Sequence, residues 1–179
     1  MPLTSNQAGQ MYALTVMSPV VPSRAQTLRD ILDRLPRRPS PFARLTSVHF
    51  ARWVFMPNFV ADPSQPAPEH LPAPYLLFSA TFDGSLDAFL EDLTTRLAAE
   101  AEGIYGSCIG APEPPRGHPL QDYLRHNQVQ TGLFFAAYPD ATVEMVRDAL
   151  SVRERVIQFA IRGQGMRPDE LRDSFRREF

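Results

Sequence analysis

Apolar residues recur along the chain with two spacings, which predict a mixture of strands and helices. Strands are expected where β-branched and aromatic residues form short runs that end near Pro or Gly. These runs cover residues 11–20, 44–56, 75–83 and 130–138. Helices are expected where apolar residues recur every three to four positions. That spacing covers residues 24–35, 86–97 and 143–161, with a short further helix over 120–127.

Two segments interrupt this pattern. Asn58–Pro74 contains five prolines and few residues able to join a core. It predicts an unusually long hairpin loop that serves as a lid, a binding loop or a partner contact. From Gly163 onward the chain is charged and has few large apolar residues. We therefore expect a single domain over residues 1–162 and a C-terminal tail over residues 163–179 that acts as a partner-contacting arm.

The order of the elements predicts the fold class. Two β-α-β units in succession give the split βαβ pattern of a ferredoxin-like α+β domain, βαββαβ, followed here by an extra C-terminal helix. Right-handed crossovers place both connecting helices on one face of the antiparallel sheet. The runs WVFM, YLLF and LFFAAY are nevertheless apolar at successive positions, so both faces need cover. A second copy of the same sheet is the simplest cover, which predicts a sheet-to-sheet homodimer.

In this element order and in its two apolar sheet faces, the chain resembles the dimeric α+β barrel superfamily over residues 11–161. That superfamily includes cofactor-free monooxygenases of antibiotic biosynthesis, small isomerases and cyclases, and the haem-binding chlorite dismutases and dye-decolourising peroxidases. The resemblance implies a barrel made by two copies, with a small-molecule site. It is a resemblance of fold, and it carries over no catalytic residue.

Composition excludes several kinds of chemistry. All 18 basic residues are arginine, so a Schiff-base lysine, a pyridoxal-phosphate lysine and a phosphate-binding loop with its lysine are excluded. The net charge of −2 gives no general attraction for nucleic acid or an anionic membrane. No apolar run approaches the ~20 residues of a membrane-spanning helix. The one cysteine, Cys108, excludes an internal disulfide and suits the reducing cytoplasm, where we expect the protein to be.

The second predicted strand carries a histidine and an arginine among large apolar residues, in the run TSVHFARWVFMP. His49 and Arg52 are three residues apart, and an odd separation on a strand predicts opposite faces of the sheet. A polar group on an apolar sheet face is costly unless it is paired or used. We therefore expect this strand to be the centre of a site.

His49 is the candidate general acid or base, because its ordinary pKa lies near neutrality. It shares a predicted strand face with Ser47 and Trp53, and Asp83 is its candidate catalytic partner. If the faces of neighbouring strands coincide, these residues line one small-molecule pocket with aromatic walls at Trp53 and Tyr75. The other substrate-binding candidates are Thr15, Ser79 and Thr81. The alternative is a core histidine that a hydroxyl or a carbonyl satisfies.

Arg52 has two interpretations. A buried guanidinium must be paired, and the carboxylates of Asp83, Asp87 and Asp92 are its candidate structural partners. Alternatively, its planar fork binds a carboxylate of the substrate.

We expect no metal site, because no pair of histidines shows HxH or HxxxH spacing and Cys108 has no CxxC partner. No cofactor is expected, although one proximal histidine would suffice for haem, and His49 or His126 could supply it.

Three functions are compatible with these patterns. The first is a small enzyme without metal or nucleotide, a cyclase, isomerase or cofactor-free oxygenase, that acts on a hydrophobic or aromatic metabolite with His49 moving the proton. The second is a non-catalytic protein that binds a small hydrophobic molecule or haem in the same pocket. The third is a structural protein whose sheet face and tail build an oligomer.

Overall fold

The computed structural model describes residues 6–59, 64, 67 and 69–179. Contacts group the chain into two compact units, Met1–Val143 and Glu144–Phe179. The sequence pattern placed a boundary after residue 162, which falls inside the second unit, at the end of its long helix.

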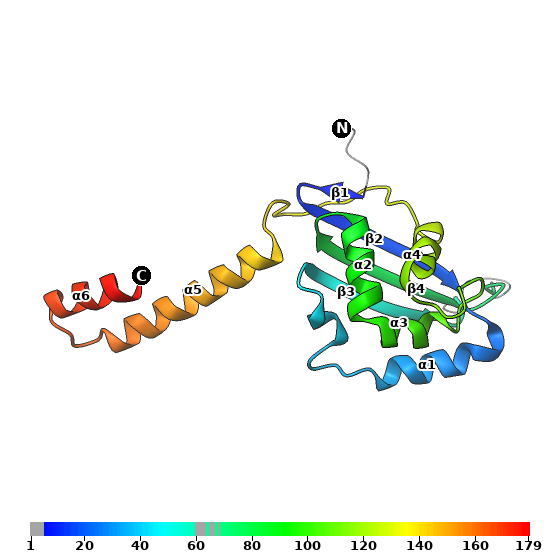
Figure 1. The fold of residues 1–179 in the computed structure, drawn as a ribbon, viewed down its shortest axis with the longest axis horizontal. Coiled ribbons are helices and arrows are strands. Elements are labelled where there is room, and N and C mark those ends of the chain that lie inside the picture. The colour runs from blue at the N-terminus through cyan, green and yellow to red at the C-terminus, as the bar shows by residue number, and fades with distance from the viewer. Residues whose placement is uncertain (1–5, 60–63, 65–66, 68) are drawn as a thin grey trace. The chain divides into compact units, whose positions relative to one another are not determined.

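The first unit is an α+β domain built on one antiparallel sheet (Figure 1). The order β1-β2-β4-β3 places the third long strand between the first two, as the split βαβ pattern requires. This arrangement is compatible with a ferredoxin-like fold. The strands are β1 (Gln7–Ala8), β2 (Met11–Pro19), β3 (Val48–Met56) and β4 (Tyr75–Asp83).

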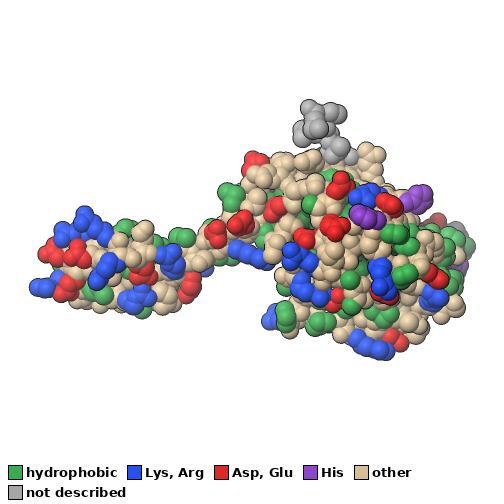
Figure 2. All heavy atoms as spheres, in the orientation of Figure 1, with side chains coloured by type: hydrophobic (Ala, Val, Ile, Leu, Met, Phe, Trp, Pro, Cys, Tyr) green, Lys and Arg blue, Asp and Glu red, His purple; other side chains and the backbone are tan. Residues whose placement is uncertain are grey.

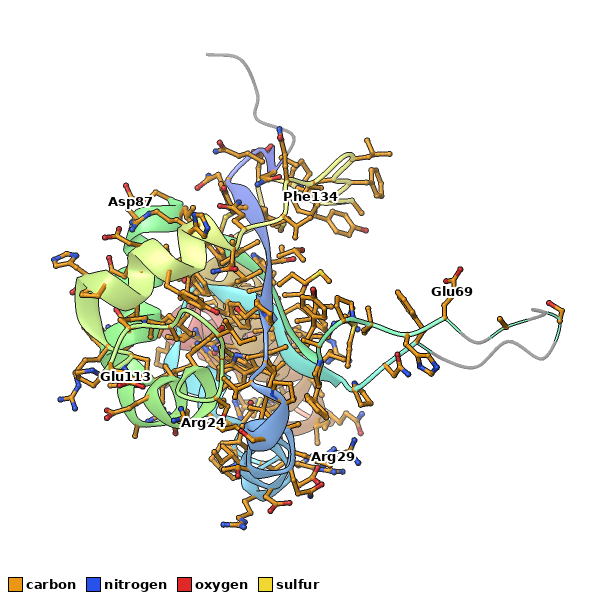
Figure 3. All side chains as sticks on the ribbon, turned by 90° about the vertical axis from the view of Figure 1, so that its right-hand side faces the viewer. Arg24, Arg29, Glu69, Asp87, Glu113 and Phe134 are labelled. Carbon is orange, nitrogen blue, oxygen red and sulfur yellow. The ribbon has the colours of Figure 1, made fainter. Side chains whose placement is uncertain are left out.

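Helices cover one face of this sheet (Figures 1 and 3). They are α1 (Ala25–Arg34), α2 (Leu86–Arg96), α3 (Ala98–Tyr105) and α4 (Gly117–His126), with short 3₁₀ turns at Pro22–Arg24 and Pro41–Arg44. The helix α2 begins where Ser85 accepts a hydrogen bond from the backbone N–H of Ala88 at 3.2 Å. Figure 2 shows arginine and acidic side chains interspersed over this helix-covered side, as on an ordinary solvated surface.

The core lies between these helices and the sheet, and a row of aromatic rings runs through it. Phe89 of α2 stacks on Phe82 of β4 with ring centroids 3.9 Å apart, and Phe78 lies beside it. Trp53 of β3 continues the row between Phe78 and Phe42, with centroids 5.7 and 4.4 Å away. Offset contacts of this kind add to the free energy that burial of the rings supplies.

The predicted strand over residues 130–138 is wrong, because that segment forms no strand. Short segments share the outer edge of β2 instead. The strand β1 pairs with Met11 and Tyr12, while the backbone of Asn127 and Val129 bonds to Met17 and Thr15. A third segment meets the far end, where Val20 pairs with Cys108. Asn6, buried beside β2, accepts the backbone N–H of Thr131 through its side chain at 2.7 Å.

The second unit is a helical hairpin. Its helices are α5 (Val143–Arg162) and α6 (Pro168–Glu178), so the predicted tail contains a helix. Phe159 of α5 packs edge-on against Phe175 and Phe179, and Arg162 pairs with Glu178 at 2.6 Å. Much of the apolar side of α5 is exposed, including Met145, Leu150 and Ile161. Within the described part of the chain, no helix has the length and apolar character needed to cross a membrane.

Cys108 is a buried thiol in the core. It is only 6% exposed, although it borders a surface hollow that Arg24 also lines. Burial raises the pKa of its thiol to about 12, and burial likewise raises the pKa of Tyr123 beside it to about 12. A thiol that stays protonated at neutral pH is a poor nucleophile.

The thiol should therefore resist labelling in the folded protein. At pH 8 we expect Ellman's reagent to react with Cys108 roughly 10³-fold more slowly than with an exposed cysteine, because only the thiolate reacts. The same protein unfolded in guanidinium should label fully, which is the control. Stoichiometric labelling of the folded protein within minutes would show instead that the thiol is reactive.

Candidate functional site

The face of the sheet opposite the helices carries most of the predicted polar residues. Cross-strand partners share a face, so the register of β2, β4 and β3 arranges this open face in rows that cross three strands. The rows are Phe50–Thr81–Ala13, Arg52–Ser79–Thr15, Val54–Leu77–Met17 and Met56–Tyr75–Pro19. We call the second of them the polar row, and the third and fourth together the apolar half.

The predicted opposition of His49 and Arg52 is wrong, because β3 contains one extra residue. Val48 pairs with Phe82 and Phe50 with the adjacent Thr81, so His49 has no partner of its own on β4. An extra residue of this kind is a β-bulge, which re-aims side chains. Here it lets the His49 side chain reach Asp83 on the open face, the face that also carries Arg52.

His49 and Asp83 form a close pair. The Nε2 atom of His49 lies 2.7 Å from Oδ1 of Asp83, and the two side chains are 21% and 14% exposed. An ionised carboxylate can only accept, so Nε2 is the donor in this contact, and in the neutral imidazole Nδ1 is then the acceptor. The other oxygen of Asp83 accepts the backbone N–H of Val143 at 2.7 Å. Two bonds from well-separated elements therefore fix the carboxylate that orients the imidazole.

A hollow of about 300 Å³ opens beside this pair. His49, Phe50, Thr81 and Met11 line it from the sheet, and residues 134–138, the covering segment, line it from above. In Figure 3 the helices α2 and α4 lie on one side of β2, whereas Phe134 lies on the other. Phe135 and Tyr138 of the covering segment are 82% and 77% exposed. An apolar hollow with a few convergent polar groups is the usual form of a small-molecule site.

Arg52 does not pair with the carboxylates that the sequence suggested. Asp83 binds His49, Asp87 pairs with Arg125 at 2.7 Å, and Asp92 pairs with Arg96 at 2.7 Å. Within the described residues Arg52 makes no ion pair, and its guanidinium lies 5.6 Å from the centre of the Phe50 ring. It is exposed, so the cost of burying an unpaired charge does not arise.

Two predicted walls lie away from the hollow. Trp53 pairs across the sheet with Phe78, which is buried in the core, and donates weakly from Nε1 to the hydroxyl of Tyr105 at 3.4 Å. The bulge separates it from His49, which the uninterrupted alternation had placed on the same face. Tyr75 and Asp83 lie at opposite ends of β4, about 27 Å apart at 3.4 Å per residue. They cannot bound one small pocket.

The remaining predicted residues divide between the hollow and its surroundings. Thr81 lines the hollow, and Ser79 and Thr15 belong to the polar row next to it. Ser47 contributes through its backbone, since its carbonyl oxygen accepts the N–H of Asp83 at 3.0 Å. The ends of the long loop are joined by Asn58, whose side-chain oxygen accepts the N–H of Leu71 at 2.9 Å. Other predicted contacts of that loop fall on residues 60–63, 65–66 and 68, outside the described part.

The described residues contain no group of three or more His, Cys, Asp and Glu side chains placed to hold a metal ion. His126, one of the two histidines considered for haem, is exposed at the C-terminal end of α4. His49, the other, is engaged by Asp83 through Nε2 and has Nδ1 free to accept.

Sequence reasoning missed the covering segment, because the run LFFAAY was assigned to a strand. The letters held no decisive signal: the run is apolar at consecutive positions, as the strand runs WVFM and YLLF also are, and it is followed by Pro139. Such a run at a sheet edge could equally lie over a face of the sheet, and the alternation rule cannot tell the two apart.

Comparison with known proteins adds no relative. No family model matches the chain, and neither a curated protein nor a solved structure matches it. A function for this chain therefore has to be inferred from its own residues.

Proposed function

We propose that the open face of the sheet is the active site of a small-molecule enzyme that uses neither metal nor nucleotide. The substrate is a hydrophobic or aromatic metabolite, and the reaction is a proton-transfer chemistry such as cyclisation, isomerisation or cofactor-free oxygenation. The observation that carries this proposal is the 2.7 Å contact between His49 and Asp83 in the wall of the 300 Å³ hollow.

The pair has the geometry of a base and its orienting acid. With Nε2–H held by Asp83, Nδ1 of His49 removes a proton from a substrate carbon or hydroxyl in the hollow. The carboxylate then stabilises the imidazolium that forms, as an ion pair at hydrogen-bond distance. Thr81 offers a hydroxyl to orient the substrate, and Phe50, Phe135 and Tyr138 supply apolar surface for its rings.

A second role suits the same hollow, namely binding a hydrophobic molecule or haem without catalysis. The observation that favours it is the strong exposure of Leu133, Phe135 and Tyr138, at 89%, 82% and 77%. Exposed apolar side chains in a cluster mark a surface that contacts something apolar. Retention of a ligand without turnover would distinguish this role from the first.

We also propose that two copies of the chain associate through the apolar half of the open face. Val54, Leu77 and Met17 form one row there, and Met56, Tyr75 and Pro19 form the next. Packing this half on a second copy removes apolar area from water. The polar row, His49 and the hollow then face the interior of the barrel and remain available to a ligand.

The catalytic proposal predicts that His49→Ala lowers turnover by ~10²–10⁴-fold, because the base is lost. Asp83→Asn should lower it as well, since the imidazole loses its orienting charge. The measurement is product formation by mass spectrometry across a panel of phenols, aromatic ketones and aryl acids, with melting curves for each variant. His126→Ala, an exposed histidine on α4, is the matched control. If His49→Ala only lowers the melting temperature and leaves turnover unchanged, His49 is a structural residue.

The association proposal predicts a dimer of twice 20.1 kDa in solution, with the ~1,200–2,000 Å² of a standard interface buried. Leu77→Asp should produce a folded monomer, because a carboxylate at the centre of the apolar half cannot be buried unpaired. Ala88→Asp, at an exposed site on α2, should leave the dimer intact. The test is light scattering at micromolar concentration combined with circular dichroism. A wild-type monomer would refute the association.

A further inference from the structure

The open face carries a cation without a protein counter-ion. Arg52 is exposed there and makes no ion pair within the described residues. The acidic side chain nearest in register, Asp83, already uses one oxygen for His49 and the other for the backbone of Val143. A guanidinium that its own chain leaves unpaired, beside an apolar hollow, is available to an anionic ligand.

The neighbours of Arg52 fit a carboxylate in particular. In the polar row Arg52 lies opposite Ser79, and Ser79 lies opposite Thr15 on the next strand. Side chains in such positions are about 5 Å apart at Cβ, so one carboxylate can be shared between a guanidinium fork and a serine hydroxyl. Neither hydroxyl makes a side-chain hydrogen bond within the described residues, and the guanidinium lies over the Phe50 ring at 5.6 Å.

The distance to His49 sets the size of the ligand. The row of Phe50 and Thr81 separates the polar row from the His49–Asp83 pair. Arg52 and His49 are three residues apart on β3, a span of about 10 Å. A ligand anchored at Arg52 therefore needs about two fused rings to reach the His49 imidazole. Such rings would lie against Phe50 and beneath Phe135 of the covering segment, which line the same hollow.

We infer that the ligand of this site is an aryl carboxylic acid, held at its carboxylate by Arg52 and Ser79 and presented to His49 at the far end of its ring system. This inference rests on the proposed small-molecule function and adds to it the chemical class of the substrate. It also fixes the direction of the ligand on the open face: its carboxylate binds at the polar row, and its far end lies at His49, where the proton is transferred.

The test uses 2-naphthoate and its neutral analogue 2-naphthamide as probes, with binding measured by calorimetry at low salt. The wild-type protein should bind 2-naphthoate about 10- to 100-fold more tightly than 2-naphthamide, the range of a charge-assisted hydrogen bond. Arg52→Gln should remove most of that preference by weakening 2-naphthoate alone, and Ser79→Ala should remove a smaller part.

Arg29→Gln is the matched control. Arg29 also lies over an aromatic ring, that of Phe55 at 5.2 Å, but it belongs to the helix-covered side, so the variant removes the same charge and the same kind of ring contact away from the open face. Binding of both probes should be unchanged in it.

Two results would overturn the inference, and they differ in what they imply for the proposed function. If the neutral probe binds as tightly as the acid, or if Arg52→Gln weakens both equally, the carboxylate preference is wrong while the hollow remains a ligand site. If neither probe binds the wild-type protein at millimolar concentration, the aryl acid class is wrong, and the turnover of His49→Ala decides separately whether the enzyme proposal survives.

Discussion

The arrangement of the candidate site depends on one irregularity in the pairing of β3 with β4. A regular ladder would alternate faces from Val48 to Met56 and would send His49 into the helix-covered core, next to Phe82 and Trp53. The extra residue at His49 shifts the alternation by one. It places the imidazole, the Asp83 carboxylate and the Arg52 guanidinium on one face of the sheet. A bulge thus substitutes for sequence proximity in assembling the site.

That face joins two surfaces with different physical requirements. At one end, burial of the rows of Val, Leu, Met and Tyr side chains away from water lowers the free energy. At the other end, a charged pair, a free guanidinium and two hydroxyls need polar partners or solvent. The covering segment lies over the end that carries His49, not over the apolar rows. Association of copies and binding of a ligand can therefore occupy different parts of the same sheet face without competing.

Much of the fold could be predicted from local patterns. Tyr75–Asp83 and the Ser85 cap lie where a short apolar run and the following turn residues placed them, because both are decided by neighbours in sequence. The run at 130–138 was assigned wrongly for a reason that is not local. The edge of β2 that it would have joined is taken by β1, by residues 127–129 and by the Cys108 segment. Competition between distant segments for one edge leaves no trace in the letters of any one of them.

The site was predictable to the same extent. His49, Asp83 and Thr81 were singled out by residue type, and the structure brings all three to one end of the sheet. Trp53 and Tyr75 were not correctly placed, because strand alternation was carried through the bulge and because nine residues of β4 extend beyond one pocket. The sequence alone does not show whether His49 or the adjacent Phe50 is the bulged residue that lacks a partner on β4.

The bulge also has a consequence for how the sheet meets other molecules. β3 is the last strand of the sheet in the described part of the chain, and its outer backbone groups form an edge onto which a foreign strand could dock. The extra residue at His49 breaks the even spacing of those backbone groups. Arg52, three residues further along β3, adds an exposed charge. Edges interrupted in this way resist the addition of strands from neighbouring chains. One inserted residue therefore both turns the imidazole toward Asp83 on the open face and interrupts the edge of the sheet.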